Sequence, residues 1–485
     1  MTDRPNILLL ITDEERERMW FPDHIRFANR ERMAARGMRF TNHHVHTFPC
    51  TPSRATILTG RHAASTRMFD NINFNWQQPL DPGIATVGHL LSAAGYTCGY
   101  LGKWHLGGES RRNGLRPYGF GDWKGPDTHG TPYLGHFIDG RTADHAGRWI
   151  TEHADRGPWL LVCSFVNPHD IMLYPRFRKP RVTDHGAQLP PNFADDLSTK
   201  PVTQRYWKVT CDITGGRVRD EKAWRRLINA YIDLNLEVDH HIGTVLDALA
   251  ASGAESNTLV VATSDHGDLA GAHGLRQKAA NLYRENAQVP LTMTWPGTIP
   301  AGGSSRRLTG AVDLLPTLLA VAGGGVGPLS DPLPGRDLSP LWQDPQRAIR
   351  DSVLVTSDAF SSMGPAGPHR GFLRGIITES HKYGRYFLPG EQHRGRAAAD
   401  LELYDRARDP AEMCSLVAAH GPDVGPLIDD LDHRLDALIA AEVGADEVDL
   451  PLPKSRLTSL GYLWRRRARV TGVASDAMTG ARSGA

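Results

Sequence analysis

Short apolar runs alternate with stretches of helical periodicity over the first two thirds of the chain. The run from Ile7 to Ile11 is uniformly apolar and has the length of a buried strand, and Trp159–Val166 and Thr258–Thr263 are similar runs. Between the last two, Glu221–Ala251 places apolar side chains every three or four residues, as an amphipathic helix does. The pattern predicts alternating strands and helices.

Shorter segments continue this alternation. Helices are predicted near Arg30–Arg36, Ser53–Thr59 and Val87–Ala94, and a strand at Thr97–Leu101. Such alternation favours an α/β sandwich, in which helices flank a large, mostly parallel central sheet. Ligands of such sheets bind at the carboxyl ends of the strands.

The pattern changes from Asp351 onward. Four short strand-like pieces precede a helical stretch at Val424–Ala441; they are Ser352–Thr356, Phe372–Thr378, His381–Phe387 and Leu401–Asp405. We expect a smaller C-terminal antiparallel sheet with a closing helix. The predicted domains are a catalytic α/β domain (1–350), a small α+β subdomain (351–450) and a basic tail (451–485).

Composition and charge exclude some classes of partner. The 485 residues are 40% hydrophobic and 22% charged, as in an ordinary globular protein, and the formal net charge is +1. That balance gives no general attraction to nucleic acid or to an anionic membrane, so we expect neither as a partner. A homo-oligomer stays open, with the basic tail as the place to look for a subunit contact.

The N-terminus and the cysteines bear on the compartment. The apolar run that ends at Ile11 is too short to span a membrane and has no small-residue cleavage site after it. Five cysteines are scattered along the chain without a CxxC pair. They predict a reducing cytoplasm, with no disulfide framework and no structural zinc site.

One segment pairs a nucleophile with features that attract an anion. In Cys50-Thr51-Pro52-Ser53-Arg54, a thiol precedes a short helix begun by a proline, and an arginine follows four residues later. The N-terminus of a helix favours negative charge. The alternative is a buried structural cysteine, because most cysteines are inert.

Two predicted strands end in carboxylates. Asp13 follows the first strand, and Asp265 with His266 follows Thr258–Thr263, so all three are expected at one edge of the sheet. Together with an oxygen from residue 50 they could hold a divalent cation. Each aspartate alone is explained as a helix N-cap.

Three further motifs add cations and imidazoles. In the segment Gly102–Gly107, Lys103 and His105 are two residues apart, so both can face one side of an extended segment. His169 follows the strand at Trp159–Val166, and Lys278 lies thirteen residues after Asp265. Each of these residues also has a structural explanation. Lys103 could pack its stem on apolar surface and His105 could lie at the edge of the core. His169 could belong to a surface turn, and Lys278 could be a solvated charge.

These motifs resemble those of the type I sulfatases of the alkaline phosphatase superfamily, over roughly the first 340 residues and more loosely beyond. The resemblance implies that a formylglycine-generating enzyme oxidises Cys50 to formylglycine, which works as its hydrate. It also implies one divalent cation, calcium first, with magnesium or manganese as alternatives. The implied ligands are Asp13, Glu14, residue 50, Asp265 and His266. Glu14 departs from the family pattern, in which this position is usually Asp, Gln or Asn.

The resemblance also implies roles around a small-molecule sulfate ester. Lys103 contacts the sulfate and the nucleophile, and His105 takes a proton from the second hydroxyl of the hydrate. His169 and Lys278 lie on the sulfate and leaving-group side, and Arg54 adds positive charge to the anion hole. The expected activity is hydrolysis of a sulfate monoester, as in arylsulfatases.

Two other functions stay open. Asp265-His266 also occurs in relatives that hydrolyse phosphonate monoesters or phosphodiesters, and a binding relative that is not matured at Cys50 would keep the same fold. The histidines 43, 44 and 46 could suggest a second metal, but we expect them to line the pocket or to form hydrogen bonds within their own segment.

Overall fold

The computed structural model describes residues 4–110, 112–125, 134–176, 181–323, 331–362, 369–419, 421 and 423–446. The predicted basic tail at 451–485 lies outside these ranges.

An eight-stranded sheet forms the centre of the molecule. Its middle strand β1 (Asn6–Asp13) pairs in parallel with β6 (Trp159–Pro168) and β7 (Thr258–Ser264). The strand order is β5-β4-β6-β1-β7-β8-β2-β9, and β8 is antiparallel to both of its neighbours. The prediction of a mostly parallel sheet is therefore confirmed. The other strands of the sheet are β2 (Met38–Phe40), β4 (Thr97–Gly102), β5 (Asp122–Lys124), β8 (Leu291–Thr294) and β9 (Gly303–Ser305).

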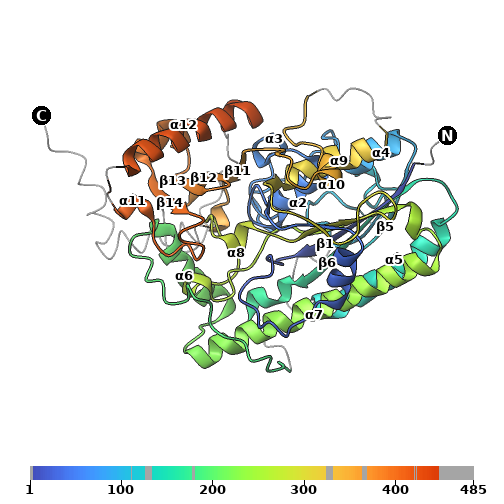
Figure 1. Cartoon of the computed structure of the whole chain (residues 1–485), viewed down its shortest axis with the longest axis horizontal. Helices are drawn as coiled ribbons and strands as arrows, with labels where there is room; N and C mark the ends of the chain where they lie inside the picture. Colours follow the sequence, from blue (N-terminus) through green and yellow to red (C-terminus); the bar gives the residue numbers. More distant parts are fainter. Residues whose placement is uncertain are drawn as a thin grey trace, which may run out of the picture.

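Helices cover both faces of this sheet (Figure 1). Because successive side chains of a strand point to opposite faces, Ile7, Leu9 and Ile11 join one hydrophobic core while Leu8 and Leu10 join another. The first core is closed by α2 (Cys50–Thr59), α4 (Val87–Ala93) and α9 (Leu314–Val321), and the second by α5 (Leu134–His153) and α7 (Glu221–Ala251).

The C-terminal part forms the predicted four-stranded antiparallel sheet. Its order is β11-β12-β13-β14, and α12 (Val424–Glu442) packs on it through Leu431, Leu435 and Ile439. The bounds of its strands are Ser352–Ser357, Phe372–Thr378, His381–Phe387 and Asp400–Asp405. The remaining short elements are α1 (Ala28–Ala35), β3 (His43–His44), α3 (Ala63–Thr66), α8 (Arg284–Ala287), β10 (Thr309–Gly310), α10 (Pro340–Gln343) and α11 (Leu416–Ala419).

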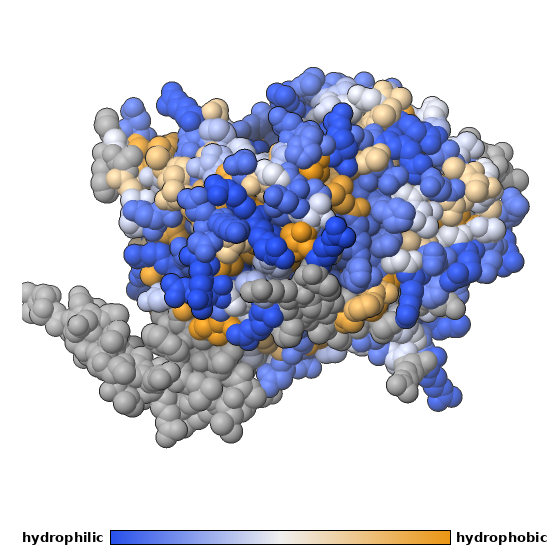
Figure 2. All heavy atoms as spheres, turned by 90° about the horizontal axis from the view of Figure 1, so that it is seen from below, coloured by the Kyte–Doolittle hydropathy of each residue, from blue (hydrophilic) through white to orange (hydrophobic). Residues whose placement is uncertain are grey.

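The outer surface is polar where it is seen in Figure 2, with apolar residues in small scattered groups. Among the described residues, the large hydrophobic side chains with high exposure are Phe137, Val209 and Ile213. None of the described helices combines the length and the apolar character that crossing a membrane requires.

Candidate active site

The predicted nucleophile and the two strand-end carboxylates meet at the carboxyl edge of the large sheet. β1 ends at Asp13, β7 is followed by Asp265 and His266, and α2 begins at Cys50. The Sγ atom of Cys50 lies 3.1 Å from His266 Nε2 and 3.7 Å from Asp13 Oδ1. The backbone N–H of Glu14 donates to Asp265 Oδ1 at 3.1 Å, so the two strand ends are also linked directly.

Arg54 lies one turn after Cys50 on α2 and joins the two aspartates. Its Nε donates to Asp265 Oδ2 and its Nη2 to Asp13 Oδ2, both at 2.8 Å. Its Nη1 donates to the carbonyl of Lys103 and to the hydroxyl of Ser164. With 1% of its side chain exposed, Arg54 is engaged by protein oxygens. This geometry suits it to orienting the carboxylates.

Glu14 and Lys278 form a second buried pair. Lys278 Nζ lies 2.6 Å from Glu14 Oε2, and His169 Nε2 lies 3.7 Å from the same oxygen. Burial raises the pKa of Glu14 well above its usual range, and Lys278 offsets only part of that effect. Lys278 is 5% exposed, so the structure does not place it as a solvated surface charge.

The segment after β4 carries Lys103 and His105, but it is not extended as the sequence suggested. Gly102 has φ 91° and His105 has φ 59°. Gly102 adopts this angle readily because it has no Cβ, and a side chain there would also meet the carbonyl oxygen of Ser164. The turn nevertheless brings Lys103 Nζ to 2.6 Å from Asp13 Oδ2. His105 Nε2 lies 3.0 Å from the amide oxygen of Asn73.

The pKa values of Asp13, Asp265 and Cys50 are shifted in different directions by burial and by neighbouring charges. Burial alone would raise the pKa of Asp13, but Lys103, His169 and Arg54 hold it well below its usual range. Burial and the Asp13 charge raise the pKa of Asp265. Burial and Asp13 also raise the pKa of the Cys50 thiol to about 11. The thiol of Cys50 is therefore neutral near pH 7, although it lies at a helix N-terminus.

The ligand atoms fit a hard or borderline divalent cation. Those of Asp13, Cys50, Asp265 and His266 lie within 4.8 Å of one another, and those of Asp13, Glu14 and His169 form an overlapping group. His266 Nδ1 faces the carbonyl oxygen of Gly267 at 3.0 Å, so Nδ1 carries the proton and Nε2 offers its lone pair to the cluster. Sulfur at position 50 is the one soft donor, and an oxygen there would complete the set.

The neighbouring histidines form hydrogen bonds within the protein. His43 Nδ1 lies 3.0 Å from Thr309 Oγ1, His44 Nε2 lies 2.8 Å from Asn42 Oδ1, and His46 Nδ1 donates to the carbonyl of Leu354 at 2.7 Å. Burial lowers the pKa of each of the three rings, so they are neutral.

Two residues of the site were not found from the sequence. Asn73 contacts His105 from the loop after α3, and Ser164 contacts Arg54 from within β6. Neither belongs to a motif with a chemical signature, because an isolated Asn or Ser is common in loops and strands. Only the folded arrangement identifies them.

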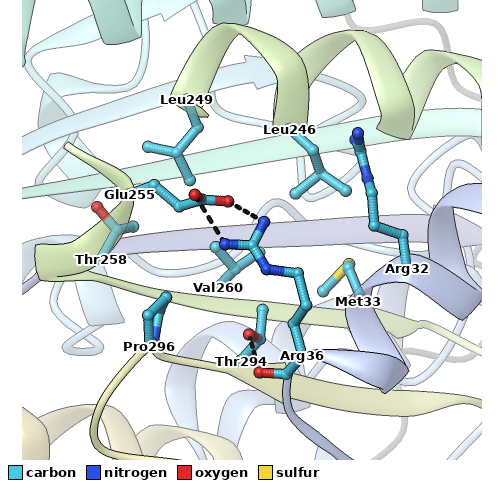
Figure 3. Close-up of a pocket in the computed structure, with 10 residues that line it drawn as sticks. All are labelled: Arg32, Met33, Arg36, Leu246, Leu249, Glu255, Thr258, Val260, Thr294 and Pro296. Atoms are coloured by element: carbon cyan, nitrogen blue, oxygen red, sulfur yellow. Dashed lines mark hydrogen bonds and ion pairs between the residues drawn. The ribbon is translucent and has the colours of Figure 1, made fainter. Parts of the chain in front are cut away.

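A second concavity, shown in Figure 3, lies at the opposite end of the sheet. Its lining includes Arg36, which pairs with Glu255 through both carboxylate oxygens, and Thr258 at the start of β7. With a volume of about 20 Å³ it has room for about one water. It contains none of the predicted catalytic residues.

Comparison with known proteins places the chain in a family. The sulfatase family model matches residues 5–324, and the model of the C-terminal region of N-sulphoglucosamine sulphohydrolase matches residues 271–441. The chain is 30% identical over 458 residues to the N-acetylgalactosamine-6-sulfatase of Sus scrofa, covering 85% of this chain and 81% of that protein. It is 27% identical over 457 residues to the choline-sulfatase of Rhizobium meliloti, covering 86% of each.

Solved structures share the fold. One is a protein solved in complex with its substrate, D-glucosamine-2-N,6-O-disulfate. It matches with a TM-score of 0.72 at 21% identity, covering 92% of this chain and 100% of that chain. Another is the phosphonate monoester hydrolase of Agrobacterium radiobacter, with a TM-score of 0.71 at 22% identity, covering 91% and 96%. The fold is thus shared by enzymes with different ester substrates. With the family model matching about two thirds of its length, this chain belongs to the sulfatase family, whose members hydrolyse sulfate esters.

Proposed function

We propose that this sulfatase hydrolyses a small sulfate monoester with a formylglycine hydrate formed from Cys50 and one divalent cation. The observation that carries the proposal is the position of Cys50, 3.1 Å from His266 Nε2 and 3.7 Å from Asp13 Oδ1, at the carboxyl edge of the sheet. Cationic groups surround this point, as the binding of a sulfate requires.

The unmodified thiol is a poor nucleophile in this position. With a pKa of about 11, only about one thiol in ten thousand is ionised at pH 7. Oxidation of Cys50 by a formylglycine-generating enzyme would replace the soft sulfur by oxygen, which suits both the carboxylate-rich ligand set and attack on a sulfate.

Asp13, Glu14, Asp265 and His266, with an oxygen of residue 50, would hold the cation. Calcium is the first choice because the donors are mainly carboxylate oxygens, and magnesium and manganese accept the same donors. When bound, the cation supplies positive charge that activates the nucleophile and stabilises the sulfate in the transition state.

The cationic side chains divide the remaining work. Lys103 and Lys278 neutralise charge on the sulfate oxygens, while Arg54 keeps Asp13 and Asp265 in place. Burial, together with Lys278 and Lys103, lowers the pKa of His169 well below its usual range, so its ring is neutral. Burial alone would lower the pKa of Lys278, but the carboxylates of Glu14 and Asp13 raise it, so Lys278 is the protonated group proposed to serve the leaving oxygen.

His105 is the proposed base for the second hydroxyl at position 50. The amide oxygen of Asn73 accepts a hydrogen bond from its Nε2, which leaves Nδ1 as the nitrogen that can take a proton. Once the first hydroxyl at residue 50 has been sulfated, loss of the proton from the second would break the bond between the carbon of residue 50 and the sulfate oxygen. Sulfate would leave and the aldehyde would form again, so no water need attack a hindered ester.

Phosphonate monoester hydrolysis is the second candidate. It is favoured by His266, which contacts Cys50, and by the shared fold of the Agrobacterium radiobacter enzyme. Lys103 and Lys278, each paired with a carboxylate of the site, instead favour a compact sulfate over a phosphonate ester. Among sulfate esters, the neighbour bound to D-glucosamine-2-N,6-O-disulfate supports sulfated sugars as the class to test after an aryl sulfate.

The deciding experiment compares kcat/KM for an aryl sulfate and for the matching aryl phosphonate monoester. It uses protein in which mass spectrometry of the peptide 40–54 has verified conversion of Cys50, with Cys50→Ala as the control. We expect a preference for the sulfate that disappears in the control. A preference for the phosphonate would assign the pocket to a phosphorus ester, and an unconverted peptide from the native organism would contradict the proposal.

A further inference from the structure

A polar pocket lies where the end of α6 (Val202–Gly215) approaches the start of α7. Its volume is about 220 Å³, enough for a sulfate or carboxylate group together with part of a sugar ring. Its lining includes Lys208, Asp212, Arg217, Arg219 and Arg276. None of these residues has a part in the proposed mechanism.

The lining carries four cationic side chains and one carboxylate. Asp212 is 3.8 Å from the guanidinium of Arg276, which leaves Lys208, Arg217 and Arg219 without an ion pair among the described residues. All three are exposed, and Lys208 Nζ lies 3.6 Å from where a Cβ of Gly274 would stand. Like charges around one concavity create a positive potential that an anion would neutralise.

The inner wall of the pocket is fixed by Arg276. Its guanidinium donates to the backbone carbonyls of Tyr174, Cys211 and Gly216, and it is 3% exposed. Trp207 Nε1 in turn donates to the carbonyl of Arg276 at 3.1 Å. The pocket is therefore built on a hydrogen-bonded wall, and three exposed cationic side chains complete its lining.

The same wall borders the leaving-group side of the active site. Arg276 lies two residues before Lys278. The short helix η2 (His169–Leu173) begins at His169, and the residue that follows it, Tyr174, offers its carbonyl to Arg276. Met172 of this helix touches Lys278, with Sδ 3.5 Å from Nζ. The pocket thus adjoins the two segments that carry the groups proposed to face the leaving alcohol.

We propose that this pocket binds a second anionic group, a sulfate or a carboxylate, on the alcohol that the enzyme releases. The substrate then carries at least two negative charges, one at the reacting ester and one held by Arg217, Arg219 and Lys208. A single guanidinium binds such oxyanions through two parallel hydrogen bonds. This assignment of a substrate class rests on the proposed sulfatase function.

The test measures binding in the Cys50→Ala protein, in which turnover is blocked. Isothermal titration calorimetry compares N-acetylglucosamine 6-sulfate, whose amide nitrogen is uncharged, with glucosamine 2-N,6-O-disulfate, which carries a second anionic group on that nitrogen. We expect the disulfate to bind about tenfold tighter, as a charge-assisted contact allows, and the double variant Arg217→Gln/Arg219→Gln to remove most of that advantage. The affinity for the monosulfate should not change.

The matched control is Arg205→Gln/Lys222→Gln, which removes two exposed cations of α6 and α7, the helices that flank Arg217 and Arg219, at positions outside the pocket lining. It should leave the advantage of the disulfate intact. A disulfate that does not bind, an advantage that survives in Arg217→Gln/Arg219→Gln, or an equal loss in the control would each overturn the proposal. Hydrolysis of an aryl sulfate by the Cys50 protein tests the sulfatase function separately, because that substrate has no second anion.

Discussion

Charged side chains that are fully withdrawn from water define the site at the scale of single residues. Asp13, Asp265, Arg54 and Lys103 are each no more than 1% exposed, and ion pairs join them to one another. Removing one member of such a group leaves the others buried and unpaired, which costs more than the pair contributes. Each of these residues therefore affects both stability and chemistry.

Arg54→Met should destabilise the protein strongly. The substitution keeps the volume of the stem but leaves both Asp265 and Asp13 without their guanidinium partner, at a cost of about 3–5 kcal/mol in the free energy of unfolding. Urea denaturation measures this change. Arg61→Met is the control, because the guanidinium of Arg61 donates to the carbonyl oxygen of Asp331 and has no ion pair among the described residues, and it should cost about 1 kcal/mol or less. Equal costs for the two variants would contradict the prediction.

Asn73→Ala should lower kcat by about tenfold or more, because the ring of His105 loses the partner that fixes its orientation and tautomer. KM for an aryl sulfate should hardly change, since Lys103 and Lys278 are untouched. Asn73→Asp keeps an acceptor oxygen and should retain more activity than Asn73→Ala. Asn75→Ala, at an exposed position of the same loop, serves as the control. A similar loss of kcat in that variant would attribute the effect to the loop as a whole and contradict a specific role of Asn73.

Removing the cation should abolish activity reversibly. The oxygen-rich ligand set predicts that dialysis against a chelator strips the ion and that calcium, or to a lesser degree magnesium or manganese, restores turnover. Elemental analysis by mass spectrometry measures the metal bound per chain alongside kcat. Full activity with far less than one ion per chain would refute the proposed centre.

At the scale of elements, the end of β4 shows how tightly the strands hold the site. Gly102 has φ 91°, and a Cβ there would lie 2.0 Å from the carbonyl oxygen of Ser164 on β6, which also accepts from Lys103 N. No other residue type can occupy this position without moving the segment that carries Lys103.

Gly102→Ala should therefore lower stability well beyond the cost of a left-handed backbone. Gly95→Ala is the matched control, since Gly95 has φ 87° and an open environment. The control should cost about 1–2 kcal/mol, and Gly102→Ala should cost clearly more and also reduce kcat/KM. Thermal unfolding and aryl sulfate kinetics measure the two effects. Indistinguishable variants would mean that the contact with Ser164 relaxes freely.

Most elements were predictable because their patterns are strong. The strands β1, β6 and β7 are largely apolar because they are buried on both faces, and the long apolar period of α7 reflects burial of one helix face. No comparable signal marked α5 and α6. α5 contains three glycines and a buried Asp139, and α6 contains several β-branched residues, so packing against neighbours overrides weak helix propensity.

At the scale of the whole molecule, the large α/β part and the small antiparallel sheet share a hydrophobic core. Val45, Phe48 and Leu282 from the large part pack with Val353 and Leu373 from the small sheet. We propose the division at residue 350 as an architectural one, since β11 begins at Ser352, rather than as a boundary between independently folding units.

Leu282→Ala should destabilise both sheets together. Leu282 is fully buried and fills the space left by Gly375 and Gly384, so truncation opens a cavity at a cost of about 2–5 kcal/mol. Urea unfolding followed by far-UV and near-UV circular dichroism should show one coincident transition at lower urea. Leu427→Ala on α12, which is only partly buried, should cost less. Two separate transitions would identify independent domains.

The sequence by itself determined the fold class, the family and the identity of the chemical groups, because these follow from local periodicity and from motifs whose residues are close together in the chain. It could not determine how Arg54, Glu14 and Cys50 are charged or paired. Those properties depend on burial and on partners up to 264 residues away, such as Lys278 for Glu14. Asn73, Ser164 and the cationic pocket at Arg276 likewise exist only where the tertiary structure brings separate segments together.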